Sequence, residues 1–116
     1  MESVVLVKEI AETLKDKKAR DVNIIDIENI TILADYFVIC NGTSGIHIKT
    51  LADELDLKLK EKGANLHHVE GYESARWILM DYGNVIVHIF HEEERKFYNL
   101  ERLWSDGIIE YNQDGI

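Results

Sequence analysis

The sequence has few of the residues that carry covalent or structural chemistry. Among 116 residues there is one cysteine, Cys40, and no proline. A single cysteine excludes an internal disulfide, and the N-terminus, MESVVLVKEIAETLKDKK, lacks the features of a signal peptide. Both observations predict a protein of the reducing cytoplasm. No apolar run approaches the roughly 20 residues that a transmembrane helix requires, so no membrane segment is expected.

Basic residues are also scarce. The chain carries 13 Lys and Arg against 22 Asp and Glu, for a formal net charge of −9. Because neutralising nucleic acid phosphates requires clustered Lys and Arg, direct binding of nucleic acid through a broad basic surface, or sequence-specific binding, is not expected. The acidic excess is larger in residues 64–116 than in residues 1–63. Such a surface attracts basic proteins, such as ribosomal proteins. On charge alone, however, an acidic surface that keeps the protein soluble is the simpler interpretation.

The length of the chain predicts one domain over residues 1–116, with a frayed tail at 105–116. The expected fold class is α/β of the mixed α+β kind, a single mixed sheet with flanking helices. A helix starting at Thr43 or Ser44 should end at Gly63, and Tyr82, Gly83 and Asn84 should form a hairpin turn. The other expected helices are 3–18 and 92–104, and the expected strands are 21–27, 35–40, 66–69, 76–81 and 85–90.

The turn at residues 41–45 joins a strand to a helix through two glycines, as phosphate-binding turns do. It also resembles the turn that opens nucleotidyltransferase active sites, which need two or three metal-binding carboxylates on the strand after the helix. Here that strand, 66–70, carries only Glu70, while Asp53 and Asp56 lie within the helix. The turn is therefore interpreted as a helix cap whose glycines serve backbone geometry.

The other reactive side chains form no recognisable catalytic or metal-binding set. His88 and His91 have H-x-x-H spacing, but on a strand they point to opposite faces. Adjacent His67 and His68 diverge for the same reason, and Cys40 is expected to be a small core group. Ser44 and Ser74, the serines considered as nucleophiles, lack the G-x-S-x-G elbow. The sequence predicts no enzyme, no metal and no cofactor.

Aromatic residues are more informative. Trp104 shares a helical face with Phe97 and Leu100, which predicts a core position. Trp77 alternates with Leu79 along its strand and could be either core or surface. The polar residues around it are typical of the rim of an exposed binding anchor.

At these residues the chain resembles the ribosomal silencing factor family, RsfS or Iojap. The resemblance covers Ile30 to Trp104, and it rests on the segments ADYFVICNGTS, VEG, SARWILMDYG, VIVHIF and RKFYNLERLW. It implies a five-stranded mixed sheet of nucleotidyltransferase-like topology without the catalytic acids. Two positions depart from the family pattern: His47, where Gln is common, and Asn84, where Asp is usual.

The resemblance also implies a function. The family binds the large ribosomal subunit through ribosomal protein L-fourteen and blocks joining of the small subunit, which represses translation. Mapped onto this chain, Trp77 is the expected anchor, surrounded by Glu70, Glu73, Ser74 and Asp81, with His88 and Tyr98 as further candidates. A homodimer is left open. The competing interpretations are a nucleotide-binding domain using residues 42–45 and an acidic adaptor for another basic partner.

Overall fold

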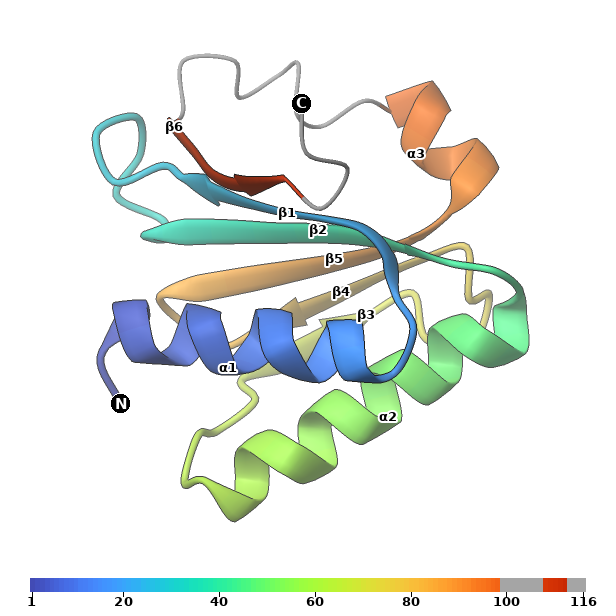
Figure 1. The fold of residues 1–116 in the computed structure, drawn as a ribbon, viewed down its shortest axis with the longest axis horizontal. Coiled ribbons are helices and arrows are strands. Elements are labelled where there is room, and N and C mark those ends of the chain that lie inside the picture. Colours follow the sequence, from blue (N-terminus) through green and yellow to red (C-terminus); the bar gives the residue numbers. More distant parts are fainter. Residues whose placement is uncertain (99–107, 113–116) are drawn as a thin grey trace.

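One mixed sheet organises the molecule. The computed structural model describes residues 1–98 and 108–112, with side chains described through Lys96. The sheet has the strand order β3-β4-β5-β2-β1-β6, and α1 and α2 lie on one of its faces while α3 lies on the other side (Figure 1). In chain order the elements are α1 (Ser3–Asp16), β1 (Arg20–Asp26), β2 (Tyr36–Gly42), α2 (Gly45–Glu61), β3 (His68–Glu70), β4 (Trp77–Asp81), β5 (Val85–His91), α3 (Glu92–Tyr98) and β6 (Ile108–Asn112).

The expected mixed sheet with flanking helices is confirmed, but it contains six strands rather than five. The additional strand, β6, pairs antiparallel with β1 and lies within the segment 105–116, which was expected to fray. Its sequence, IIEYN, is rich in residues that favour strands, and the outer edge of β1 offers unpaired backbone groups. The tail prediction overlooked this pairing, which depends on a contact far away in sequence.

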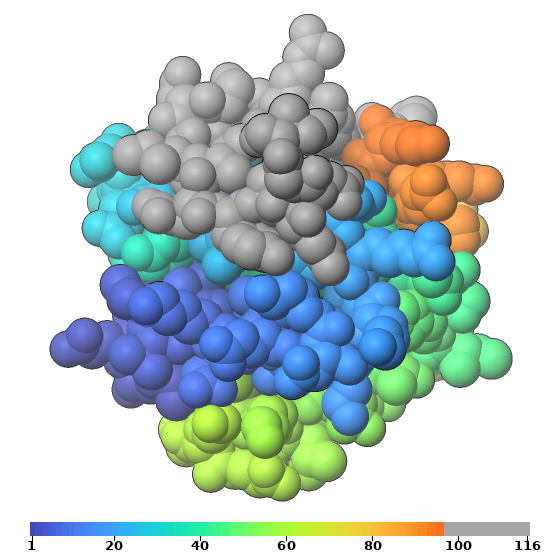
Figure 2. Space-filling view, viewed as in Figure 1, coloured from blue at the N-terminus to red at the C-terminus, as the bar shows by residue number. Residues whose placement is uncertain are grey.

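The centre of the sheet is a parallel pair, β2 and β5, in which Ile39 lies opposite His88. Every residue of β2 is buried, as the nearly continuous apolar run at residues 35–40 predicts for a strand covered on both faces. The helix-covered face forms the larger core, in which α1 and α2 contribute residues at helical spacing. Figure 2 shows α1 as a surface helix above α2.

The ends of α2 match the sequence prediction. Ser44 is the N-cap, and its side chain accepts a hydrogen bond from the His47 backbone N–H at 3.1 Å. Gly63 follows the helix with φ +85°, a conformation that glycine adopts without steric cost. Packing requires a glycine at position 42, before the helix, because an added Cβ would lie 2.5 Å from Ile48 Cγ1. The glycine at this turn is therefore explained by the close approach of β2 and α2.

Candidate partner-binding surface

The two faces of the sheet differ in how completely they are covered. On β4, Ile78 and Met80 are buried against the helices, whereas Trp77, Leu79 and Asp81 point to the opposite face and are half-buried. Residues paired across neighbouring strands point to the same face of the sheet. The partners of Trp77, Leu79 and Asp81 on β3 and β5 therefore also belong to this second face. Leu79 lies opposite Glu70 of β3 and opposite His88 of β5.

A partly exposed surface results, which we call the β3–β5 strip. Its apolar residues, each half-buried, are Trp77, Leu79 and Ile86. The polar residues that flank them on the same face are His68, Glu70 and Asp81. His68 and Glu70 are exposed and form an ion pair of 3.0 Å between Nε2 and Oε1. Apolar residues with a charged border are the composition of a protein-binding surface.

Trp77 is held in place by two buried rings. Its indole stacks on Phe90 with ring centroids 4.8 Å apart, and its Nε1 donates a hydrogen bond to His88 Nδ1 at 3.1 Å. His88 in turn packs edge-on against Phe37 at 4.8 Å. With only 4% of its surface exposed, His88 supports the indole from beneath and offers no surface to a partner. In the structure His88 therefore contacts the indole rather than solvent, and its expected place in the binding set stays a prediction.

The other expected site residues lie at the ends of the strip. Glu70 borders it on β3, and Asp81 is half-buried, its Oδ1 accepting from the Gly83 N–H at 2.7 Å to close the β4–β5 hairpin. That hairpin turn is as predicted, with Tyr82 N–H bonded to the Val85 carbonyl at 3.0 Å. Tyr98 is the last residue of α3, and its side chain lies outside the described part of the chain, as do Phe97, Leu100 and Trp104.

Glu73 and Ser74 lie in the turn between β3 and β4, just before Trp77. Both are exposed, and the Ser74 hydroxyl donates to the Gly71 carbonyl at 3.3 Å. The same turn leans toward α2, where the Tyr72 hydroxyl donates to Asp53 Oδ2 at 3.0 Å. This hydrogen bond raises the pKa of Tyr72. The structure thus brings Glu73 and Ser74 to the Trp77 end of the strip without a described contact to the indole.

Beside Trp77, β4 is tied to α3 by an ion-pair cluster. Arg76 Nε donates to Glu94 Oε1 at 2.7 Å, and its guanidinium lies 3.4 Å from Glu93 Oε2. The hydrogen bond to Glu94 and its charge raise the pKa of Arg76. The sequence predicted a helix starting at residue 92 but did not indicate that Arg76, 18 residues before Glu94, would pair with it.

Chemistry that would indicate an enzyme is not assembled in the described residues. Cys40 is fully buried, and burial raises the pKa of its thiol to about 12, so it is no nucleophile near neutral pH. Asp56 is paired with Lys60 at 3.2 Å on α2. Within the described part of the chain, no three His, Cys, Asp or Glu side chains form a group that could hold a metal ion. No described helix is long and apolar enough to cross a membrane.

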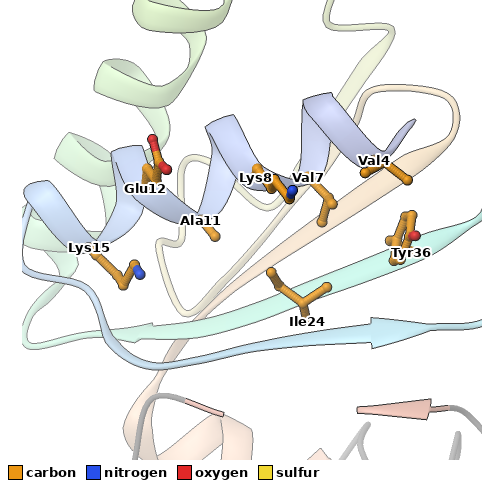
Figure 3. Close-up of a pocket in the computed structure, with 8 residues that line it drawn as sticks. All are labelled: Val4, Val7, Lys8, Ala11, Glu12, Lys15, Ile24 and Tyr36. Atoms are coloured by element: carbon orange, nitrogen blue, oxygen red, sulfur yellow. The ribbon is translucent and has the colours of Figure 1, made fainter. Parts of the chain in front are cut away.

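A groove runs along α1. It has a volume of about 290 Å³, and Figure 3 shows α1 side chains facing Ile24 and Tyr36 of the sheet across it. Its charged residues are Lys8, Glu12 and Lys15, one carboxylate between two ammonium groups. The lining includes no histidine, cysteine or serine, so it offers no acid–base or nucleophilic pair.

Sequence reasoning missed part of the surface. Leu79 and Ile86 were not selected, although their alternation with buried neighbours is the signal that places them beside Trp77. Phe90, which supports the indole, and Phe37, which packs against His88, come from two other strands, and only the strand pairing reveals them. Of the two departures from the family pattern, His47 has a structural role, because its Nε2 lies 2.9 Å from the Lys17 carbonyl. At Asn84 only the backbone carbonyl has a described bond, from the Asp35 N–H at 2.8 Å, and any residue would supply it.

Comparison with known proteins gives a consistent result. The model of the family "Ribosomal silencing factor during starvation" matches residues 1–115. The chain is 42% identical over 104 residues to the ribosomal silencing factor RsfS of Bacillus subtilis, covering 90% of this chain and 88% of that protein. It is 46% identical over 91 residues to RsfS of Halalkalibacterium halodurans, covering 78% of each. A crystal structure of a Chromobacterium violaceum protein superposes with a TM-score of 0.88 at 35% identity, covering 90% of this chain and 88% of that chain.

Proposed function

The chain belongs to the RsfS family of ribosomal silencing factors, and on this premise we propose that it represses translation by occupying the large ribosomal subunit. It does so in the cytoplasm by binding ribosomal protein L-fourteen through the β3–β5 strip. The bound domain then fills volume that the small subunit needs, so that the two subunits cannot join. The role is one of steric exclusion and requires no catalysis.

The observation that supports this proposal most strongly is the preorganised Trp77 at one end of an acid-bordered apolar strip. Its indole is half-exposed, yet it is fixed by stacking on Phe90 and by a hydrogen bond to His88. A large side chain that is already ordered loses little conformational entropy when a partner covers it. Tryptophan is also among the residues that most often dominate binding energy at protein interfaces.

The charges favour a basic partner. Glu70 and Asp81 flank the strip, Glu73 lies at its Trp77 end, and the chain carries a net charge of −9. Complementary charge speeds the encounter with a basic ribosomal protein and fixes the orientation of docking. The same negative surface repels the phosphates of incoming small-subunit rRNA. Charge therefore assists both attachment and exclusion, while the apolar residues supply most of the affinity.

A second copy of the chain is a further partner that we propose for the same strip. Two strips facing each other would bury their apolar residues by two-fold symmetry. Such a homodimer would compete with L-fourteen, because both partners cover Trp77. Sedimentation equilibrium of the wild type and of Trp77→Ala tests this: a dimer that persists unchanged in the variant would contradict the shared surface.

The proposed function is tested by cosedimentation with separated ribosomal subunits, together with capture by purified L-fourteen. The expected result is comigration with the large subunit alone and retention on L-fourteen. Comigration without retention on L-fourteen would keep the subunit as the target but contradict the docking protein. No comigration with either subunit, even at low salt, would contradict the proposal as a whole.

A further inference from the structure

A local cluster of positive charge interrupts the acidic surface. Residues 15–20, KDKKAR, contain four of the 13 Lys and Arg of the chain and one acid, Asp16. They form the end of α1, the reversal after it and the first residue of β1. Figure 2 shows this stretch at the surface, where the blue of α1 continues toward α2 and α3. We call it the basic turn.

The backbone of the basic turn repeats that of another helix end in this molecule. After α1, Ala19 N–H bonds to the Leu14 carbonyl at 2.9 Å and Lys18 N–H to the Lys15 carbonyl at 3.0 Å. After α2, the equivalent bonds join Ala64 to Leu59 at 2.9 Å and Gly63 to Lys60 at 3.0 Å. Both ends are Schellman motifs, whose left-handed position usually holds glycine.

The two helix ends differ in the residue at that left-handed position. Gly63 has φ +85°, as glycine readily adopts, whereas Lys18 is forced to φ +71°. A lysine therefore occupies a position where glycine would fold with less strain. Asp21 and Ala75 also have positive φ, so the backbone strain alone assigns no role to Lys18, and it is the charge at this position that bears on binding.

The basic turn lines an open hollow of about 550 Å³ beside the start of α2, together with Thr43 and His47. His47 fixes its shape, because Nδ1 accepts from the Thr43 N–H at 2.9 Å while Nε2 lies 2.9 Å from the Lys17 carbonyl. The nearby acids are partly engaged: Glu54 pairs with Lys17 at 3.6 Å, and Asp21 accepts from Asn41 at 3.2 Å. Within the described part of the chain, neither Lys18 nor Arg20 forms an ion pair.

The lining of the hollow fits a phosphate backbone better than a nucleotide. It contains four cationic side chains but no phenylalanine, tyrosine or tryptophan on which a base could stack. Long cationic side chains around an open hollow recognise phosphate groups without reading bases. This is a local site, and it is compatible with the absence of a broad basic surface.

The basic turn and the β3–β5 strip are aligned across the sheet. Arg20 is paired with Asn41, Asn41 with Phe90, and Phe90 with Trp77. Three strand spacings separate the ends of this row, or roughly 14 Å. In the middle of this row Arg95 of α3 donates to Asn41 Oδ1 at 3.1 Å, so a partner on Trp77 approaches Arg20 across α3. Ribosomal proteins are embedded in rRNA, so an RNA backbone is the expected neighbour of a docked ribosomal protein.

We propose that the basic turn is a second contact, which binds the phosphate backbone of large-subunit rRNA through Lys18 and Arg20, with Lys15 and Lys17 beside them. This inference rests on the proposed docking to the large subunit and names a second component of the same complex. RNA contributes affinity here without sequence specificity, and the contribution weakens as salt is raised because bound counterions are released from the phosphates.

The test compares three proteins: the wild type, the double variant Lys18→Gly with Arg20→Gln, and a control double variant, Lys8→Gln with Lys58→Gln. Both variants lose two positive charges, and the control residues are exposed lysines on α1 and α2. Each protein is titrated against purified large subunits and against protein-free large-subunit rRNA, between about 50 and 200 mM salt. Urea unfolding checks that all three fold.

On subunits, the slope of log Kd against log salt concentration should be lower by about two in the basic-turn variant than in the wild type. Its affinity deficit relative to the wild type then widens about tenfold as salt falls from about 200 to about 50 mM. The control should follow the wild type. Equal slopes for the two variants would overturn the proposal.

The rRNA titration separates this proposal from the function on which it rests. If the wild type does not bind subunits, the proposed function fails. The rRNA comparison then tests by itself whether the basic turn binds phosphate. Weaker rRNA binding by the basic-turn variant alone would keep a phosphate site on this chain. Equal binding by the two variants, or no binding by the wild type, would overturn it.

Discussion

The β3–β5 strip and the basic turn lie in one row across the sheet, but they are built differently. In the strip, an indole is immobilised by a buried phenylalanine and a buried histidine. In the basic turn, flexible cationic side chains extend from a backbone whose left-handed residue is a lysine. An ordered aromatic group surrounded by acids suits a single shaped protein partner, whereas flexible cations suit a repeating anionic backbone.

The difference teaches how a small acidic domain can attach to a particle made of both protein and RNA. In the proposed complex, burial of Trp77, Leu79 and Ile86 would supply affinity that depends little on salt. The basic turn would add a contribution that does depend on salt, and it would act only where the strip has already placed it. The predictions below separate these contributions, beginning with the largest expected effect.

Truncating the anchor should have the largest effect. Trp77→Ala removes the indole and should cost at least about 2 kcal/mol of binding to the large subunit, roughly a 30-fold loss of affinity at any salt concentration. Leu57→Ala is the matched control, because Leu57 is a large apolar side chain, 56% exposed on α2 and outside the strip. Equilibrium binding measures both. Equal affinity of a folded Trp77→Ala protein and the control would remove the strip from the interface.

Removing the support of the anchor should have a smaller effect. His88→Phe keeps a ring against Phe37 but removes the Nδ1 acceptor of the Trp77 indole. Loss of this hydrogen bond should lower the free energy of unfolding by about 1 kcal/mol, and binding should weaken less than in Trp77→Ala. Urea unfolding and subunit binding measure the two effects. A loss of binding greater than that of Trp77→Ala would show that His88 itself meets the partner.

Exchanging the residues at the two helix ends should change stability in opposite directions. Lys18→Gly relieves a left-handed lysine and should raise the free energy of unfolding by up to about 1 kcal/mol, whereas Gly63→Lys should lower it by a similar amount. Urea midpoints of the two single variants give the comparison. A destabilised Lys18→Gly protein would mean that the lysine serves the fold, which would weaken the argument for a binding role.

Neutralising the border of the strip should have the smallest effect. Glu70→Gln removes an exposed charge that pairs with His68, and exposed pairs contribute at most about 1 kcal/mol. Association with the large subunit should slow by a few-fold at low salt and be unchanged at high salt, while dissociation is unaffected. Stopped-flow binding at two salt concentrations distinguishes these rates. A change confined to dissociation would place Glu70 inside the interface rather than at its border.

Much of the fold could be predicted because its signals are local. The apolar stripe of α2, its Ser44 cap and the nearly continuous apolar run in β2 are each visible within about ten residues of sequence. The alternation of Trp77 with Leu79 likewise indicated which side chains share a face. The position of β6 could not be predicted, because it depends on the unpaired edge of β1, more than 80 residues earlier.

The site was harder to predict for the same reason. Its supports come from strands that the chain brings together only on folding: Phe37, His88 and Phe90 converge under Trp77 from β2 and β5. Burial of His88 could not be read from its spacing, which suggested a polar surface residue equally well. The alignment of Arg20 with Trp77 depends on three strand pairings, so the basic residues at 15–20 showed no relation to the strip in the sequence.

The most direct test of the central claim is a subunit-joining assay that follows light scattering as small subunits are added to large subunits. Preincubation with the wild-type protein should reduce joining in proportion to occupancy, and Trp77→Ala should require roughly 30 times more protein for the same reduction. Undiminished joining at concentrations of wild type that saturate the large subunit would contradict steric exclusion. Equal potency of the two proteins would contradict the strip as the docking surface.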